Sequence, residues 1–133
     1  MLFAGTLIIK DGNVLLVQEA HTEAYGLWSL PMGSVELNER PEDAAIRETK
    51  EETGFNVKVT RSKVLNLSGE ELKCLSRFNH EKIDFHVFEG EIVSGELSKG
   101  HDILDAKWFP INDIKTLELR GQWVLNFAQN GIV

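Results

Sequence analysis

The stretch GSVELNERPEDAAIRETKEETGF, residues 33–55, carries the most informative spacing in this chain of 133 residues. Its glycine and charged positions of interest are Gly33, Glu39, Arg47, Glu48, Glu51, Glu52 and Gly54. With glycine, glutamate and arginine each at roughly 7% of residues, this spacing arises by chance at a given start on the order of once in a hundred million. Pro41 favours a helix start and Gly54 a left-handed helix end, so residues 41–53 are predicted to form a helix.

Three carboxylates share one side of this predicted helix. Glu48, Glu51 and Glu52 are three or four residues apart, which places them on one face of a helix with 3.6 residues per turn. Like charges at this spacing cost roughly 0.2–0.5 kcal/mol per pair. Arg47 offsets part of this repulsion through its i,i+4 pair with Glu51, and a divalent cation that prefers carboxylate oxygens, Mg²⁺ or Mn²⁺, would offset the rest. A solvated acidic surface is the alternative for Glu51 and Glu52 taken alone.

Residues 33–55 resemble the Nudix box, the signature of the Nudix hydrolases and their MutT-like members, written G-x5-E-x7-R-E-U-x-E-E-x-G-U with U a bulky apolar residue. Every glycine and charged position of the box matches, Thr49 stands at the first U, and Phe55 fills the second. The preceding residues 26–33 are similar to the family's G-x-W-x-L-P-G-G lead-in, with Met32 where the first paired glycine is usual. The resemblance implies the Nudix fold, an α/β protein built as an α/β/α sandwich with a mixed β-sheet.

The resemblance also implies roles for particular residues. The metal ligands that it implies are the Met32 carbonyl, Glu48, Glu51 and Glu52. Glu48 is implied either as a ligand or as the general base, and Arg47 as the residue that orients a glutamate. One branch of the family adds a carboxylate six residues before the tryptophan of the late strand, and counting back from Trp108 gives Asp102. A solvated loop residue is the alternative for Asp102.

The activity implied by the resemblance is divalent-metal-dependent hydrolysis of a pyrophosphate linkage. The substrate class is a nucleoside diphosphate linked to another group X, with a nucleoside triphosphate or related small nucleotide as the MutT-like expectation. ADP-ribose or a dinucleoside polyphosphate is the alternative substrate, and a nucleotide-sensing module without turnover is the alternative function. The residues themselves do not identify X, the base or the metal, which is expected to be Mg²⁺ or Mn²⁺.

Size and composition indicate one domain over residues 1–133, large enough for a hydrophobic core. The net charge of −7 argues against a protein that tracks a nucleic-acid backbone, because such affinity comes from lysine and arginine. A lone cysteine, Cys74, excludes an intrachain disulfide. Without a basic leader or an apolar run near the ~20 residues that a membrane helix needs, the protein is expected to be cytoplasmic. The sequence does not decide between a monomer and a homodimer.

The remaining elements are expected at the following residues: strands 3–9, 14–17, 55–67, 83–92 and 106–109, and a helix over 111–130. Asp11-Gly12 is a hairpin signal, so the first two strands are expected to pair antiparallel. Trp28, in the loop 21–33, is a candidate stacking platform for a base. Trp123 lies near the apolar stripe of the C-terminal helix and is expected in the core.

Overall fold

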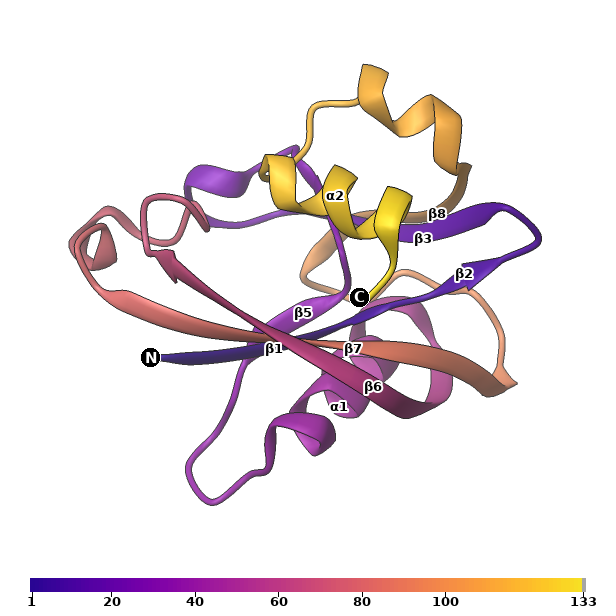
Figure 1. The fold of residues 1–133 in the computed structure, drawn as a ribbon, viewed down its shortest axis with the longest axis horizontal. Helices are drawn as coiled ribbons and strands as arrows, with labels where there is room; N and C mark the ends of the chain where they lie inside the picture. Colours follow the sequence, from indigo (N-terminus) through magenta and orange to yellow (C-terminus); the bar gives the residue numbers. More distant parts are fainter. Residues whose placement is uncertain (133) are drawn as a thin grey trace.

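The computed structural model describes residues 1–132 and places a central mixed sheet between two helices (Figure 1). The sheet has the order β5-β1-β7-β6, formed by Met32–Ser34, Leu2–Leu7, Lys82–Gly95 and Phe55–Ser68. Strand β1 pairs parallel with β7 and antiparallel with β5, and β6 pairs antiparallel with β7. In Figure 1, helix α1 (Pro41–Thr53) lies below this sheet and helix α2 (Gln122–Asn130) above it. The expected α/β sandwich with a mixed sheet is confirmed.

A second, antiparallel sheet contains β2 (Ile9–Lys10), β3 (Asn13–Glu19), β4 (Trp28–Ser29) and β8 (Ile103–Pro110). The turn between β2 and β3 has positive φ at both central residues, 52° at Asp11 and 78° at Gly12. This is the geometry that an Asp-Gly hairpin favours. The predicted hairpin is therefore confirmed at its turn.

The expected pairing of residues 3–9 with 14–17 is wrong over most of its length. Only the short strand β2 pairs with β3, while β1 belongs to the other sheet. The chain passes from one sheet to the other at Ile8, whose side chain is buried and whose carbonyl accepts the N–H of Leu15. The alternating pattern could not show this change, because both sheets bury their apolar residues in the same interior.

Helix α1 has the bounds that the sequence predicts. Arg40 makes no side-chain cap, and Gly54 closes the helix with φ of 81°. The face toward the sheet is lined by small residues and two threonines: Ala44, Ala45, Thr49 and Thr53. Thr49 fits here because its hydroxyl lies 2.8 Å from the Thr6 hydroxyl on β1 and also donates to the Ala45 carbonyl. A buried hydroxyl with both bonds made carries no desolvation penalty, which explains the departure from a bulky apolar residue.

The predicted helix over 111–130 is wrong in its middle. The chain forms a 3₁₀ segment, η3 (Ile111–Thr116), then an extended connection, and then α2. Within the connection the Glu118 carbonyl accepts the N–H of Trp28, and the N–H of Arg120 donates to the Trp28 carbonyl. These backbone groups bond to β4 and are unavailable for helical bonds.

The main core cluster lies between the mixed sheet and α2, and a smaller one joins the sheet to Ala44 and Ala45 of α1. Trp123 packs edge to face on Phe85 with ring centroids 5.2 Å apart, as its apolar stripe predicts. Trp28 packs against Phe109 at 4.8 Å and is also buried, so its ring is part of the core rather than an open stacking platform. Two further 3₁₀ segments are η1 (Thr22–Ala24) and η2 (Ser76–Phe78). Over residues 1–132, no helix is long and apolar enough to cross a membrane.

Candidate active site

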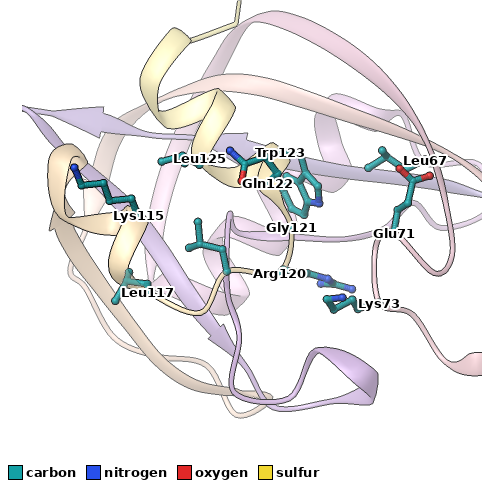
Figure 2. Close-up of a pocket in the computed structure, with 11 residues that line it drawn as sticks. Leu67, Glu71, Lys73, Lys115, Leu117, Arg120, Gly121, Gln122, Trp123 and Leu125 are labelled. Carbon is teal, nitrogen blue, oxygen red and sulfur yellow. The ribbon is translucent and has the colours of Figure 1, made fainter.

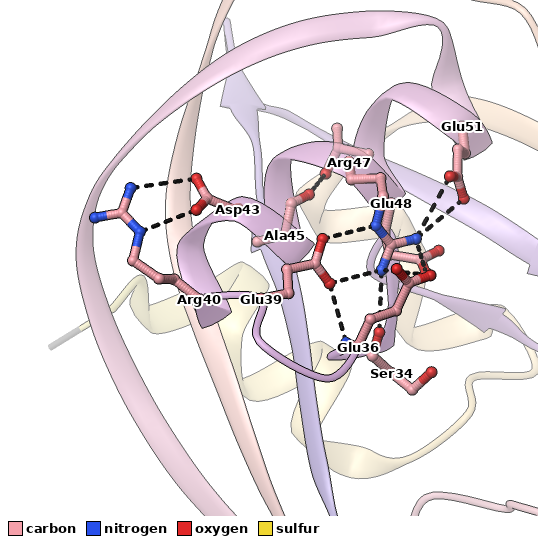
Figure 3. Close-up of polar contacts among 10 residues, drawn as sticks. Ser34, Glu36, Glu39, Arg40, Asp43, Ala45, Arg47, Glu48 and Glu51 are labelled. Carbon is pink, nitrogen blue, oxygen red and sulfur yellow. Dashed lines mark hydrogen bonds and ion pairs between the residues drawn. The ribbon is translucent and has the colours of Figure 1, made fainter.

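Arg47, on α1, holds three glutamates of the 33–55 stretch together (Figure 3). Its Nε donates to Glu39 Oε2 at 2.8 Å and its Nη2 to Glu39 Oε1 at 3.0 Å, a bidentate pair. Its Nη1 donates to Glu48 Oε1 at 2.9 Å and, more weakly, to Glu51 Oε1 at 3.4 Å. Arg47 therefore contacts three glutamates of the stretch, and its role in orienting them stays a prediction.

The same guanidinium fixes the loop before α1. Arg47 Nη2 donates to the Ser34 carbonyl at 3.2 Å, and Glu39 Oε1 also accepts the N–H of Glu36 at 3.0 Å. The hydrogen bonds from Arg47 are the main reason that the pKa of Glu39 falls to about 2. Glu39 is thus a structural partner of Arg47 that ties residues 34–39 to the helix.

Glu48 lies directly over Gly33. A β-carbon at residue 33 would overlap the carboxyl group of Glu48, so only glycine allows this approach. Burial raises the pKa of Glu48 to about 6, although Arg47 acts in the opposite direction. Gly33 and Glu48 are therefore parts of one packing arrangement rather than separate signals.

Glu52 is the most enclosed of the three helical glutamates. Its Oε1 accepts the backbone N–H of Met32 at 2.9 Å. Burial raises the pKa of Glu52 well above its ordinary value, and the nearby charges of Glu19 and Glu48 add to this effect. The Met32 side chain turns into the core, where its sulfur accepts the Ser29 hydroxyl at 3.3 Å, so it leaves the space beside Glu52 free of its bulk.

One cleft of about 360 Å³ joins the glutamates to the loop before β8. Its lining residues are Glu48, Glu51, Glu52, Gly100, His101, Asp102 and Ile103. Asp102, with a side chain 85% exposed, lies 3.5 Å from His21 Nε2. Asp102 therefore lines the same cleft as the helical carboxylates. Met32 contacts this cleft through the hydrogen bond from its N–H to Glu52.

An irregularity in β8 sets the position of this loop. Gln18 pairs with Asp105 and Glu19 with Ile103, so Leu104 is an extra residue on β8. Such a bulge bends a strand and redirects the side chains beyond it. Ile103 and Asp102 follow this bend toward the glutamates.

The chemistry of the cleft fits a hard divalent cation. Carboxylate oxygens with a nearby backbone carbonyl are the donors that Mg²⁺ and Mn²⁺ prefer, and no thiolate or paired imidazole competes in the cleft lining. Within residues 1–132, no three His, Cys, Asp or Glu side chains already converge as a compact ligand set. Arg47 bridges Glu48 and Glu51.

Two charged residues that meet inside the protein were not found from the sequence, the buried Arg120 and Glu19, whose side chain is 14% exposed. Arg120 is only 5% exposed, and its Nη1 donates to Glu19 Oε2 at 2.8 Å while its Nε donates to the Leu72 carbonyl at 2.6 Å. Burial raises the pKa of Glu19, and Arg120 opposes that rise. The only signal in the sequence was Glu19, a carboxylate two residues after the apolar run 14–17. Such a placement is too common to predict a site.

Arg120 also borders a second cavity of about 550 Å³ on the α2 side of the molecule (Figure 2). Lys115, Lys73 and Trp123 contribute to its lining, and Figure 2 shows the Arg120 guanidinium reaching toward Lys73. The indole Nε1 of Trp123 is buried and has no hydrogen-bond partner among residues 1–132. Trp123 thus belongs to the core and also forms a wall of this cavity.

Comparison with known proteins places this chain in a family. The NUDIX domain model matches residues 3–127. The chain is 34% identical over 126 residues to a nudix hydrolase of Caenorhabditis elegans, covering 92% of this chain and 32% of the relative. It is 32% identical to the ADP-ribose pyrophosphatase of Methanocaldococcus jannaschii, covering 84% and 62%, and 30% identical to the oxidized purine nucleoside triphosphate hydrolase of Danio rerio, covering 91% and 73%.

The fold is similar to that of a solved NUDIX hydrolase structure. A NUDIX hydrolase from Nitrosomonas europaea has a TM-score of 0.81 at 23% identity, covering 96% of this chain and 85% of that one. The chain belongs to the Nudix hydrolase family, with the MutT-like members among its relatives. It spans about a third of the nematode relative and less than two thirds of the archaeal one.

Proposed function

We propose that this chain is a divalent-cation-dependent pyrophosphohydrolase acting on a nucleoside diphosphate linked to X, with a nucleoside triphosphate or related small nucleotide as substrate. The observation that carries the proposal is the cleft in which Glu48, Glu51 and Glu52 face Asp102. Residues 1–133 act in this proposal as one Nudix domain. The net charge of −7 supports a small nucleotide over a nucleic acid.

The proposed roles follow the contacts of each residue. Glu51, Glu52, Asp102 and the Met32 carbonyl hold Mg²⁺ or Mn²⁺. The bound cation neutralises phosphate charge and lowers the pKa of a coordinated water. Glu48 serves as a further ligand or as the base that accepts the proton of the attacking water, and Arg47 keeps its carboxylate in place.

The proposed reaction is attack by water at one phosphorus of the diphosphate bridge. A new P–O bond forms, the bond from that phosphorus to the bridging oxygen breaks, and the proton lost by water passes to the base. With a nucleoside triphosphate the products are a nucleoside monophosphate and pyrophosphate. With another X they are the monophosphate and phosphorylated X.

ADP-ribose is the second candidate substrate because the archaeal relative at 32% identity is named for it. Dinucleoside polyphosphates, or nucleotide sensing without turnover, remain as alternatives that the same experiment separates. The presence of all box glutamates favours turnover over sensing.

The test is a screen of nucleoside triphosphates, ADP-ribose, nucleotide sugars and dinucleoside polyphosphates with Mg²⁺ or Mn²⁺, with product analysis. Glu51→Gln and Glu52→Gln should lose turnover of the best substrate, whereas Glu42→Gln, on the same helix outside the cleft lining, should keep it. Unchanged turnover in both cleft variants would refute the assigned roles. Nucleotide binding by the unaltered protein with no product would identify a sensor.

A further inference from the structure

The two carboxylate oxygens of Glu19 have different surroundings. Oε2 accepts a hydrogen bond from Arg120 Nη1 at 2.8 Å. Oε1 is buried and, among residues 1–132, has no hydrogen-bond partner. A buried charged oxygen without a partner costs free energy that folding must supply, and such groups in native proteins commonly serve a ligand or a reaction.

The position of Glu19 connects this oxygen to the proposed cation site. Glu19 ends β3 and pairs in register with Ile103 of β8, which lines the cleft next to Asp102.

Met32 links the two carboxylates. Its backbone N–H donates to Glu52 Oε1, and its sulfur lies 3.7 Å from the Arg120 nitrogen that binds Glu19. Met32 thus contacts Glu52 through its backbone and the Glu19–Arg120 pair through its side chain.

The charges at this end of the cleft do not balance. Arg47 is bonded to Glu39 and Glu48, so among the described arginines only Arg120 donates a hydrogen bond to Glu19. Arg120 binds Glu19, and none of the described arginines donates a hydrogen bond to Glu52. Buried charges are ordinarily paired or bound to metal, so one further positive charge fits here.

We propose that Glu19 is a further acidic group of the divalent-cation site, with its Oε1 facing the same cation as Glu52, directly or through a coordinated water. This inference rests on the proposed function. Mg²⁺ usually keeps several waters, and a buried carboxylate oxygen is a strong acceptor for one of them. Such supporting partners change metal affinity about tenfold to a hundredfold when they are removed.

Arg120 is the positioning residue of this arrangement. Its Nη1 bond leaves Oε1 as the free oxygen of Glu19, and its own orientation is fixed by the bond from Nε to the Leu72 carbonyl. Arg120 contacts neither the cleft lining nor the three helical glutamates by a hydrogen bond in residues 1–132. Its effect on the cation therefore passes through Glu19 and through Met32, whose sulfur Arg120 Nη1 also contacts.

The experiment measures Mn²⁺ affinity by electron paramagnetic resonance on the protein without nucleotide, so that turnover plays no part. Glu19→Gln keeps the size of the side chain and an oxygen for Arg120, and should weaken Mn²⁺ binding about tenfold to a hundredfold. Glu23→Gln, an exposed change in the neighbouring η1, should leave the affinity unchanged. Circular dichroism checks that each variant is folded.

Arg120→Lys and Arg120→Gln test the positioning role by the same measurement. Lysine keeps the charge and should lose less Mn²⁺ affinity than glutamine. If Glu19→Gln does not fold, Glu19→Asp keeps the charge and withdraws the oxygen by one carbon, and weaker Mn²⁺ binding is again expected.

The outcomes separate this inference from the proposed function. Unaltered affinity in folded Glu19→Gln or Glu19→Asp, together with loss in Glu52→Gln, would overturn the role of Glu19 and leave the proposed function intact. No Mn²⁺ binding by the unaltered protein, or unchanged binding in Glu52→Gln, would instead refute the proposed metal site itself.

Discussion

The molecule uses an arginine to hold glutamates in two regions that are built in different ways. Arg47 binds Glu39 and Glu48, which are eight and one positions away in the sequence. Arg120 binds Glu19, which is 101 positions away. The Arg47 side chain is 27% exposed and that of Arg120 is 6% exposed.

This difference predicts unequal roles in stability. Partly exposed ion pairs are screened by water and contribute modestly. When one partner of a buried pair is removed, the other charge remains in the interior without compensation, which is strongly destabilising. The Arg47 region should therefore matter more for the geometry of the cleft, and the Arg120 region more for the fold.

The largest expected effect is on the buried pair. Arg120→Met should lower the free energy of unfolding by about 3–5 kcal/mol, because Glu19 and the Leu72 carbonyl lose their partner inside the protein. Urea unfolding followed by circular dichroism measures the change. Adding Glu19→Gln to Arg120→Met should recover part of the loss, and a double variant less stable than the single one would contradict this account.

Arg47→Gln should have a smaller effect, a loss of about 1–2 kcal/mol in the free energy of unfolding, since water replaces several of the lost hydrogen bonds. Urea unfolding under the same conditions gives the comparison. A loss equal to that of Arg120→Met would show that exposure does not separate the two regions.

Gly33→Ala should change the cleft more than the fold. Its β-carbon would displace the Glu48 carboxyl group, so turnover should fall about tenfold, equivalent to roughly 1.4 kcal/mol in the activation barrier. Steady-state kinetics on the best substrate of the screen measures this. Ser34→Ala, next to it with an exposed side chain, is the control and should keep normal turnover.

The smallest effect is a pH dependence at Glu39. Its pKa is lowered to about 2 in the folded protein from an ordinary value of 4.5, so its stabilising contribution is present above pH 4.5 and is lost as pH falls toward 2. The stability difference between the unaltered protein and Glu39→Gln should therefore shrink over this range. Unfolding titrations between pH 6 and pH 3 measure this stability difference. A difference that grows as the pH falls would contradict the prediction.

The sequence predicted the Arg47 region well because its information is local. Helical spacing, Pro41 and Gly54 suffice to place Glu48, Glu51 and Glu52 on one face, and the structure confirms the helix bounds. The family resemblance singled out Asp102, and the structure places this residue in the lining of the same cleft. Its role as a metal ligand stays a prediction.

The Arg120 region could not be predicted in the same way. Its geometry depends on bonds between Trp28 and residues 118–120, which interrupt the helix expected over 111–130. Hydrophobic periodicity reports which residues are buried and carries no information on which distant strand a connection will join. Glu19 and Arg120 each look like ordinary surface charges until that connection is known.

The extra residue Leu104 in β8 has a consequence for how homologous chains can vary in length. The stretch 96–100 lies outside any strand, yet the N–H groups of Ser98 and Gly100 donate to the Thr53 and Glu52 carbonyls at the end of α1, so an insertion there would disturb this contact. Deleting Leu104 would restore an unbroken ladder and shift every preceding residue by one place, turning Ile103 and Asp102 away from α1. Natural relatives are therefore expected to keep the residue at position 104.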